Sequence, residues 1–536
     1  MRLSRSALPA LGAAAALTLT SCTTASEPVD DAVSQQVAPG FLAVTDSSAP
    51  EGGELTVQLD YDAQEAGGLD PQLATAARAW SLESLVYETL VTVDEDMQPA
   101  PGLATSWSTP DDRTYVFELA PSATFSNGRP MTSGDVVGSI QRLLDGDGVW
   151  AGQLGPVASV TATGDHQVTV SLEEPHTPFL AALANTPAAV LPMQEVASGA
   201  VDLATTMLGT GPLVVTEHRQ DEQWRFGIND HWPGAEELGF SSVRIDVVPD
   251  ENTRIAALKS GSTDLAVLSS VDSAGALAST PSVTTVVQQN TDYFYLVENS
   301  RSATSALADP DVRLAVNSAI DRSAIADLVF AGQARPTGAT PVGLEGSCDP
   351  ARLPSAGSAE PTADVADRLD GLRLNLLVYS SEPALAQIAA VVQQNLAEIG
   401  VDVQIQNHDY AAYSQHVYSS DPGDFDLALS WFAGYADPSM VTAWWKPADA
   451  GFSSVYMNGS PELDALIESA RTTPAGPERD QVLDQLCARA DQESEMVPLV
   501  TRPTVVGYSD RTLSPTLTAT EGYGNVLRDV TRYRAS

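Results

Sequence analysis

The side chains that could do chemistry are scattered along this chain rather than arranged in motifs. None of the six histidines has a second histidine four positions away, so no helical metal pair is present: His166, His176, His218, His231, His408 and His416. His-Glu-x-x-His, Gly-x-Ser-x-Gly, P-loop and Gly-x-Gly-x-x-Gly patterns are absent as well. Seventy acidic residues supply many carboxylate pairs by chance, and nothing marks one of them as catalytic. The sequence therefore favours a binding protein without cofactor or metal, and a secreted hydrolase is the weaker alternative.

The thiol of Cys22 stands where a covalent modification is expected. Arg2 and Arg5 form a positive start, and 7–20 is an apolar run too short to cross a bilayer. Leu19-Thr20-Ser21-Cys22 then resembles the lipobox of bacterial lipoproteins. The resemblance implies a signal peptide over 1–21, acylation of Cys22, and anchoring at the outer face of the cytoplasmic membrane. The alternative is an ordinary secreted protein cut near Ala25.

Cys348 and Cys487 remain as an even pair outside the membrane, where a disulfide is possible. Their spacing does not require one. Cys487 also lies in a helical pattern of apolar residues over 482–488, where a free cysteine is a common buried residue. Both interpretations stay open.

Length and charge narrow the class of protein further. A chain of 536 residues is too long for one core and suggests two or three domains. The formal net charge of −43 repels nucleic acid, so neither DNA nor RNA is an expected partner. Such a surface favours solubility outside the cell and does not identify a ligand.

The hydrophobic pattern predicts a mixture of strands and helices after a polar tether over 22–53. We expect strands at 55–59, 114–119 and 167–172, and a helix that begins at Ser133. The clearest unit is a strand over 374–379, a helix from Pro383 ending before Gly400, and a strand over 401–405. This βαβ unit predicts an α/β protein with a parallel sheet.

Several segments, in order, resemble the family 5 extracellular solute-binding proteins of ABC transporters, the oligopeptide, dipeptide and nickel-binding group. They cover nearly everything from Glu54 onward. The segments are Leu69-Asp70-Pro71, Tyr87 to Val91, Pro101 to Trp107, Phe125 to Val137, Gly209 to Pro212, Asn229 to Trp232, Lys259 to Ala266, Asp311 to Ala315, Ala319 to Arg322, Phe425 to Leu427 with Trp431, and Asp437-Pro438.

The resemblance implies a large periplasmic-binding-protein-like fold with two α/β lobes, a hinge and a ligand cleft between them. Lobe one would take 54–291 and 498–536, with an extra subdomain over about 80–203. Lobe two would take 292–497. The implied function is a monomeric receptor that passes oligopeptides or dipeptides to ABC permease and ATPase subunits. The alternative is a lipoprotein of the same fold that binds a non-peptide ligand or acts in cell-envelope glycolipid assembly.

The resemblance also points to two ligand-flanking stretches, 75–80 and 430–437. The residues predicted to contact ligand are Arg78, Trp80, Trp431, Phe432, Gly434, Tyr435 and Asp437. The aromatic residues would supply stacking surfaces, and Arg78 would meet a carboxylate or phosphate. At Gly434 the chain departs from its peptide-binding relatives, which carry an aspartate there that pairs with the α-ammonium. Core packing of the aromatic residues and a solvated Arg78 are the structural alternatives.

Overall fold

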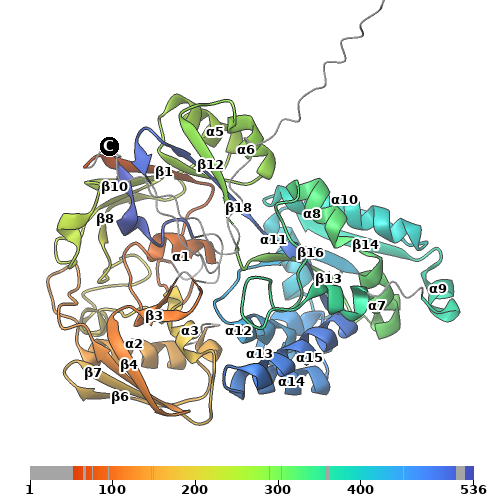
Figure 1. The fold of residues 1–536 in the computed structure, drawn as a ribbon, viewed down its shortest axis with the longest axis horizontal. Coiled ribbons are helices and arrows are strands. Elements are labelled where there is room, and N and C mark those ends of the chain that lie inside the picture. Colours follow the sequence, from red (N-terminus) through yellow and green to blue (C-terminus); the bar gives the residue numbers. More distant parts are fainter. Residues whose placement is uncertain are drawn as a thin grey trace, which may run out of the picture.

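The computed structural model describes residues 52–63, 68–74, 77–94, 96–146, 148, 150–288, 290–302, 305–356, 361–450, 452–514 and 525–535. Figure 1 shows two lobes side by side, with the N-terminal half of the chain in one of them. Cys22, the predicted signal peptide and most of the predicted tether lie outside the described residues. Within the described part, no helix is long and apolar enough to cross a membrane.

The first lobe is built on a seven-stranded sheet in the order β12-β18-β11-β1-β10-β9-β8. The predicted strand at its centre is confirmed as β1, Glu54–Leu59, which runs parallel to both β10 and β11. Leu55, Val57 and Leu59 are fully buried. The other strands are β8 (Leu213–Arg219), β9 (Gln223–Ile228), β10 (Ser242–Val247), β11 (Leu265–Leu268), β12 (Val283–Gln288) and β18 (Thr504–Ser509).

A four-stranded antiparallel sheet in the order β4-β5-β7-β6 extends this lobe. Its strands are β4 (Ala104–Asp111), β5 (Thr114–Leu119), β6 (Val157–Gly164) and β7 (Gln167–Leu172). The predictions for β5 and β7 are confirmed. The predicted helix is confirmed as α2 (Ser133–Asp145), which starts with a capping box between Thr132 and Asp135.

The second lobe holds a five-stranded sheet in the order β15-β14-β16-β13-β17. The βαβ prediction is confirmed: β14 (Arg373–Tyr379) pairs in parallel with β15 (Asp402–His408), and α10 (Pro383–Glu398) connects them. Gly400 has a φ of 85°, the left-handed conformation expected after a helix. The remaining strands are β13 (Tyr293–Glu298), β16 (Leu427–Phe432) and β17 (Met496–Thr501).

The remaining helices and the short strands complete both lobes. The first contains the hairpin of β2 and β3 and a small pair, β19 with β20. The bounds are α1 (Ala77–Glu83), β2 (Val91–Val93), β3 (Pro99–Pro101), α3 (Phe179–Leu183), α4 (Met193–Ser198), α5 (Glu251–Ser260), α6 (Val271–Leu277), α7 (Pro310–Ala319), α8 (Arg322–Phe330), α9 (Ala363–Leu369), α11 (Tyr410–Ser414), α12 (Pro438–Thr442), α13 (Pro447–Ala450), α14 (Pro461–Thr472), α15 (Pro477–Glu493), β19 (Leu513–Ser514) and β20 (Arg534–Ala535).

The chain passes between the two large sheets at two neighbouring places. It leaves the first sheet after Gln288 and enters the second at Tyr293, and it returns between Thr501 and Thr504. Because β17 continues to Thr501, the return crossing comprises residues 502 and 503. The Asn290 side-chain amide donates to the Arg502 carbonyl (3.1 Å) and to Thr504 Oγ1 (2.7 Å), so the two crossings are hydrogen-bonded to each other.

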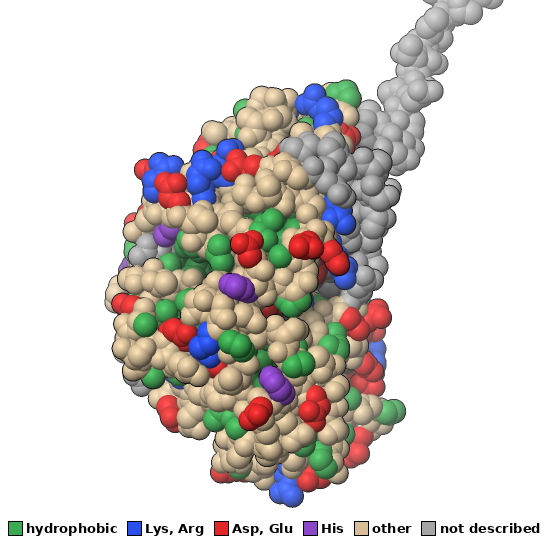
Figure 2. Space-filling model, turned by 90° about the vertical axis from the view of Figure 1, so that its left-hand side faces the viewer, with side chains coloured by type: hydrophobic (Ala, Val, Ile, Leu, Met, Phe, Trp, Pro, Cys, Tyr) green, Lys and Arg blue, Asp and Glu red, His purple; other side chains and the backbone are tan. Residues whose placement is uncertain are grey.

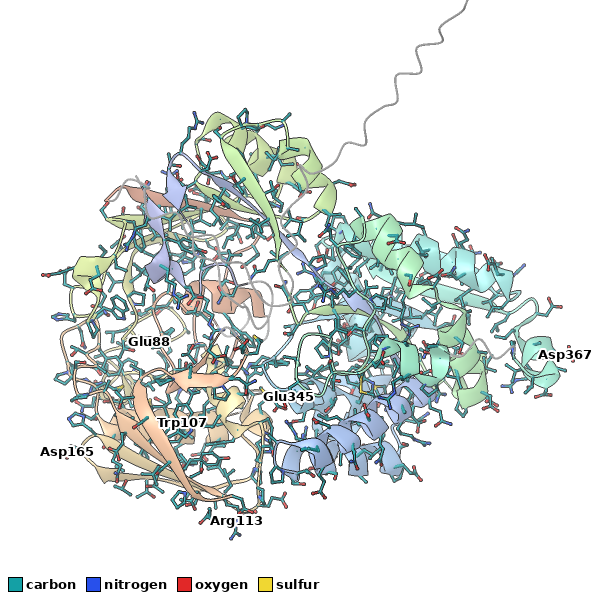
Figure 3. The ribbon with its side chains drawn as sticks, in the orientation of Figure 1. Glu88, Trp107, Arg113, Asp165, Glu345 and Asp367 are labelled. Carbon is teal, nitrogen blue, oxygen red and sulfur yellow. A yellow bond between two sulfur atoms is a disulfide. The ribbon has the colours of Figure 1, made fainter. Side chains whose placement is uncertain are left out.

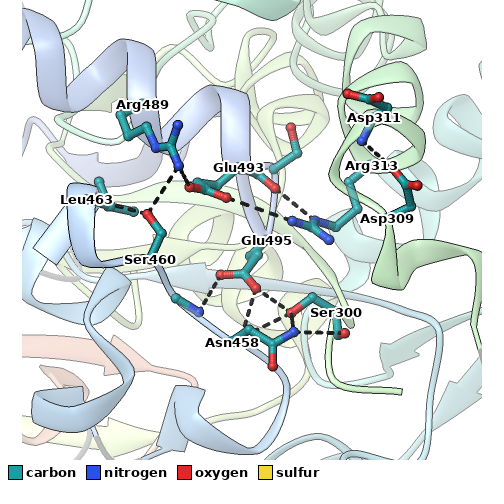
Figure 4. Close-up of polar contacts among 12 residues, drawn as sticks. Ser300, Asp309, Asp311, Arg313, Asn458, Ser460, Leu463, Arg489, Glu493 and Glu495 are labelled. Carbon is teal, nitrogen blue, oxygen red and sulfur yellow. Dashed lines mark hydrogen bonds and ion pairs between the residues drawn. The ribbon is translucent and has the colours of Figure 1, made fainter. Parts of the chain in front are cut away.

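Two buried features hold the second lobe together. Cys348 and Cys487 form a disulfide that joins the loop before α9 to α15, with Cα atoms 5.6 Å apart. The carboxylate of Glu495 accepts hydrogen bonds from the Ser300 hydroxyl and from the backbone N–H groups of Asn458 (2.8 Å) and Gly459 (3.0 Å), as Figure 4 shows. These contacts fix the ends of β13 and β17 to the loop that precedes α14.

Candidate functional site

A cleft lies between the lobes beside the two crossings. Because the carboxyl ends of parallel strands meet at one edge of a sheet, side chains that follow these strands gather there. Asp60 follows β1, Ser269 follows β11, and Ser381 with Glu382 follow β14. The cleft is lined by these residues and by Val267, Leu268, Phe294, Phe330, Ala384, Arg502, Pro503 and Thr504. Both lobes and the return crossing therefore contribute to one site.

Arg502 is the central charge of this cleft. Its guanidinium donates to Glu382 Oε2 at 2.8 Å, and the Glu382 carboxylate is almost fully buried. The same guanidinium lies over the ring of Trp431, 4.4 Å from the centroid, as a cation–π contact. The backbone N–H of Arg502 donates to the Asp292 carbonyl at 2.8 Å. Arg502 thus connects both crossings to β16 and to the start of α10.

Trp431 and Phe432 end β16 and point to opposite faces of the sheet. Trp431 is half-buried and borders the cleft through Arg502. Phe432 faces the other side, where it stacks on Tyr295 with centroids 4.3 Å apart and lies nearly parallel to Trp444 at 6.1 Å. Of this predicted pair, Trp431 therefore contacts Arg502 of the cleft lining, and Phe432 lies in an aromatic cluster of the second lobe.

Trp80 belongs to an aromatic contact that joins the lobes. Its side chain is only 4% exposed and meets Trp150 edge-on, with ring centroids 5.0 Å apart. Trp150 in turn meets Trp444 of the second lobe at 6.5 Å. Trp80 is therefore buried beside the interlobe boundary, where it packs against Trp150. Arg78 lies in the first turn of α1, and its side chain is outside the described part.

Gly434 follows β16 and packs its backbone directly against the first crossing. A Cβ atom at this position would lie 1.8 Å from Thr291 Oγ1 and 2.3 Å from the Thr291 carbonyl carbon, so no other residue fits without movement of the crossing. Its N–H donates to Asp292 Oδ1 at 2.8 Å. The missing side chain therefore has a structural reason: it lets the segment after β16 approach the first crossing.

Tyr435 and Asp437 are both buried. Tyr435 is 2% exposed, and burial together with the nearby Asp292 raises the pKa of its hydroxyl. The Asp437 carboxylate caps α12 by accepting from the Ser439 N–H at 2.8 Å, and it accepts from Arg479 Nη2 at 2.7 Å. An ion pair this deeply buried holds the carboxylate within the second lobe.

The sequence did not indicate the polar residues that line the cleft. Asp60 and Glu382 each follow a strand that was predicted, so the rule that sites form at carboxyl strand ends could have found them. Arg502 has no such signal, since its place depends on the pairing of β17 and β18 with different sheets. In the described part of the chain, no three His, Cys, Asp or Glu side chains are grouped as metal ligands.

The sequence of this chain is similar to those of known proteins. The family model described as bacterial extracellular solute-binding proteins, family 5 Middle, matches residues 98–452. The probable D,D-dipeptide-binding periplasmic protein DdpA of Escherichia coli is 26% identical over 442 residues, which cover 78% of this chain and 83% of that protein. The nickel-binding periplasmic protein of Escherichia coli is 25% identical over 466 residues, covering 81% of this chain and 86% of that protein.

Solved structures show the same architecture. The murein tripeptide binding protein MppA of Escherichia coli superposes with a TM-score of 0.74, covering 92% of this chain and 99% of that one. Its sequence identity is 23%, so this likeness concerns the fold. The predicted two-lobed, periplasmic-binding-protein-like α/β fold is confirmed.

Proposed function

The chain belongs to the family 5 bacterial extracellular solute-binding proteins, and from this premise we propose that it is a receptor that binds oligopeptides or dipeptides in its interlobe cleft and delivers them to an ABC importer. The observation that carries the proposal is the cleft itself, which takes residues from both sheets and from the return crossing. A ligand held there would contact both lobes and stabilise their closed arrangement. Permease and ATPase subunits are the proposed partners.

The moving bodies of this receptor are proposed to be the two lobes. We assign 54–291 and the segment from 504 onward to the first lobe, with 80–203 as its subdomain, and 292–501 to the second. The hydrogen bonds of Asn290 to Arg502 and Thr504 hold the crossings together. They make this pair of segments the natural axis for lobe rotation.

Peptide binding is tested by calorimetric titration with synthetic tripeptides and tetrapeptides carrying free or acetylated N-termini. If the proposal holds, at least one series binds, and Trp431→Ala weakens that binding by about tenfold or more, as loss of an aromatic anchor does. Trp107→Ala is the matched control, since Trp107 is also half-buried but lies on β4 in the subdomain (Figure 3). Absence of binding by both series would count against a peptide receptor.

A non-peptide ligand is the second candidate, including a role in cell-envelope glycolipid assembly without transport. It is favoured by position 434, which bears no carboxylate of its own. The two carboxylates near it are already engaged: Asp292 accepts from the Gly434 N–H, and Asp437 is paired with Arg479. A buried ammonium needs a carboxylate partner. Genes for a permease and an ATPase beside the gene for this chain would support transport instead.

Lipid anchoring at Cys22 is part of the proposal and rests on the residues around it. Arg2, Arg5 and the apolar run support export, and Leu19-Thr20-Ser21-Cys22 supports acylation. In cells fed labelled palmitate, the wild-type chain should incorporate label and partition into detergent. Cys22→Ser should do neither. Equal labelling of both would contradict the assignment.

A further inference from the structure

The lobes meet a second time, far from the crossings. The connection between β7 and α3, residues 173–178, lies against the end of α14 in the second lobe. The backbone N–H of Thr177 donates to the Arg471 carbonyl at 2.7 Å, and Thr177 Oγ1 donates to the Thr473 carbonyl at 2.7 Å. One residue of the first lobe therefore makes two short hydrogen bonds to the other lobe.

The acceptors of these bonds are carbonyl groups that a helix cannot satisfy itself. Arg471 lies in the last turn of α14, and Thr473 is its C-cap. The last four carbonyls of a helix have no partner within it, and they carry the negative end of the helix dipole. Thr177 supplies two donors to this end, as a C-terminal cap that comes from the opposite lobe.

The segment that carries Thr177 is held in place by its own lobe. The neighbouring His176 is only 5% exposed, and its Nε2 lies 3.0 Å from the Gln153 carbonyl. Gly155 makes room for this ring: with its φ of 70°, it approaches so closely that a Cβ would lie 2.4 Å from His176 Cγ. The buried His176 side chain therefore anchors the segment that carries Thr177 to the first lobe.

A ring contact lies along the same boundary between the lobes. Trp150 meets Trp444 at 6.5 Å and 83°. Trp150 is itself fixed, since its indole N–H donates to the Ala74 carbonyl at 2.7 Å. The boundary thus combines apolar contact with the two directional hydrogen bonds of Thr177.

We propose that Thr177, with the Arg471 and Thr473 carbonyls, is a latch that holds the interlobe cleft closed through protein contacts alone, and so sets how often the receptor opens to exchange ligand. The inference rests on the proposed function, because it describes the regulation of the same cleft. Every hydrogen bond of the latch joins protein atoms, so the latch needs no ligand to form in the arrangement of the lobes that the structure shows. A ligand then binds a receptor whose closed state is already favoured, and its apparent affinity rises with that population.

The Thr177 amide is a direct probe of the latch, because its acceptor lies in the other lobe. We would unfold the full chain in guanidinium to release bound molecules, refold it, and measure hydrogen exchange at single-residue resolution with no ligand added. The latch predicts a protected Thr177 amide. Thr177→Val removes the hydroxyl donor but keeps the shape, and should lower protection at residue 177 about fivefold, the effect of one net hydrogen bond. Thr177→Ser restores the donor and should exchange like the wild type.

Thr216→Val is the matched control. Thr216 Oγ1 donates to the Arg225 carbonyl at 3.1 Å within the first lobe, so its loss should leave exchange at Thr177 unchanged. Exchange of the wild-type Thr177 amide at the rate of an unstructured peptide would overturn the latch. So would a Thr177→Val effect of equal size on core amides of both lobes, which would indicate a general loss of stability. Because no ligand is added, these results are independent of whether peptides bind.

Discussion

At the scale of single residues, Glu298 stands out at the end of β13. Its carboxyl group is fully buried, and within the described part of the chain neither oxygen has a hydrogen-bond partner. Burial raises the pKa of this group well above its ordinary value, and the nearby guanidinium groups of Arg313 and Arg322 offset this only in part. The folded protein therefore keeps Glu298 neutral over a pH range in which the unfolded chain ionises it.

This difference predicts how Glu298 affects stability with pH. Below about pH 4.5 the carboxyl group is neutral in both states, whereas above it only the unfolded chain loses the proton, so the folded state loses relative stability as pH rises. Glu298→Gln cannot ionise and should therefore gain free energy of unfolding over the wild type between pH 4.5 and 7.5, measured by urea unfolding. If the two proteins differ in free energy of unfolding by the same amount at pH 4.5 and at pH 7.5, the assignment is contradicted.

The close packing at Gly434 predicts that a larger side chain there destabilises the protein. Gly434→Ala places a methyl group against the Thr291 backbone, and overpacking of this kind costs about 1–3 kcal/mol of unfolding free energy. The control is Gly152→Ala, because a Cβ at Gly152 would have no heavy atom within 4 Å. We expect the melting temperature to fall for the first variant and not for the second. Equal melting temperatures would show that the crossing tolerates a side chain.

The residues of the site were only partly predictable from sequence. The family resemblance pointed to the stretch 430–437, and within it Trp431 contacts Arg502, which lines the cleft. The resemblance could not show that Phe432 faces the opposite side, since this depends on which face of the sheet the cleft borders. Arg502 and Asp292 lie 210 positions apart in the sequence, and only the two crossings bring them together.

At the scale of elements, Asp437 both caps α12 and pairs with the buried Arg479. Asp437→Asn keeps a capping side chain but removes the charge, and an unpaired buried partner costs about 3–5 kcal/mol. Asp250→Asn is the matched control, because Asp250 caps α5 by accepting from the Thr253 N–H while exposed to solvent. A chemical denaturation series should show a much larger loss for Asp437→Asn. Equal losses would mean that the ion pair contributes little.

The disulfide supports the long loop that precedes α9. Cys348 and Cys487 are 139 positions apart, and closing a loop of that length removes unfolded-state entropy worth about 5 kcal/mol in the chain-entropy model. Replacing both residues by serine should therefore lower stability by about 2–5 kcal/mol. The melting temperature of the wild type should fall on reduction, whereas that of the double variant should not respond to reductant. A wild-type melting temperature that reductant leaves unchanged would contradict this account.

Local elements could be predicted because their signals are local. The pattern of β14, α10 and β15 contains a proline start, an apolar face and a terminal glycine, all within one short stretch. The order of the strands could not be predicted. In the first sheet β18 lies between β11 and β12, although more than 200 residues separate it from either. Such pairing depends on tertiary packing and leaves no periodic trace in the sequence.

At the scale of the whole molecule, the two lobes are joined by the two crossings and line one cleft. They also meet where Thr177 contacts the end of α14. The net charge of −43 is spread over the chain, and Figure 2 shows acidic side chains dispersed among uncharged ones on one face of the first lobe. Such a surface favours solubility and gives no specificity. We propose that specificity comes from the cleft, where Arg502 contacts both Glu382 and Trp431.

The central claim is that this chain is a receptor that encloses a solute between its lobes. Native mass spectrometry of the protein purified from its own cells tests it most directly, with release and identification of any bound molecule under denaturing conditions. We predict a complex of one chain with one small molecule, and a peptide would establish the proposed ligand class. A glycolipid or other compound would assign the cleft to the second candidate. A chain that carries no ligand, and that acquires none from the metabolites and peptides of its own culture medium, would contradict the receptor account.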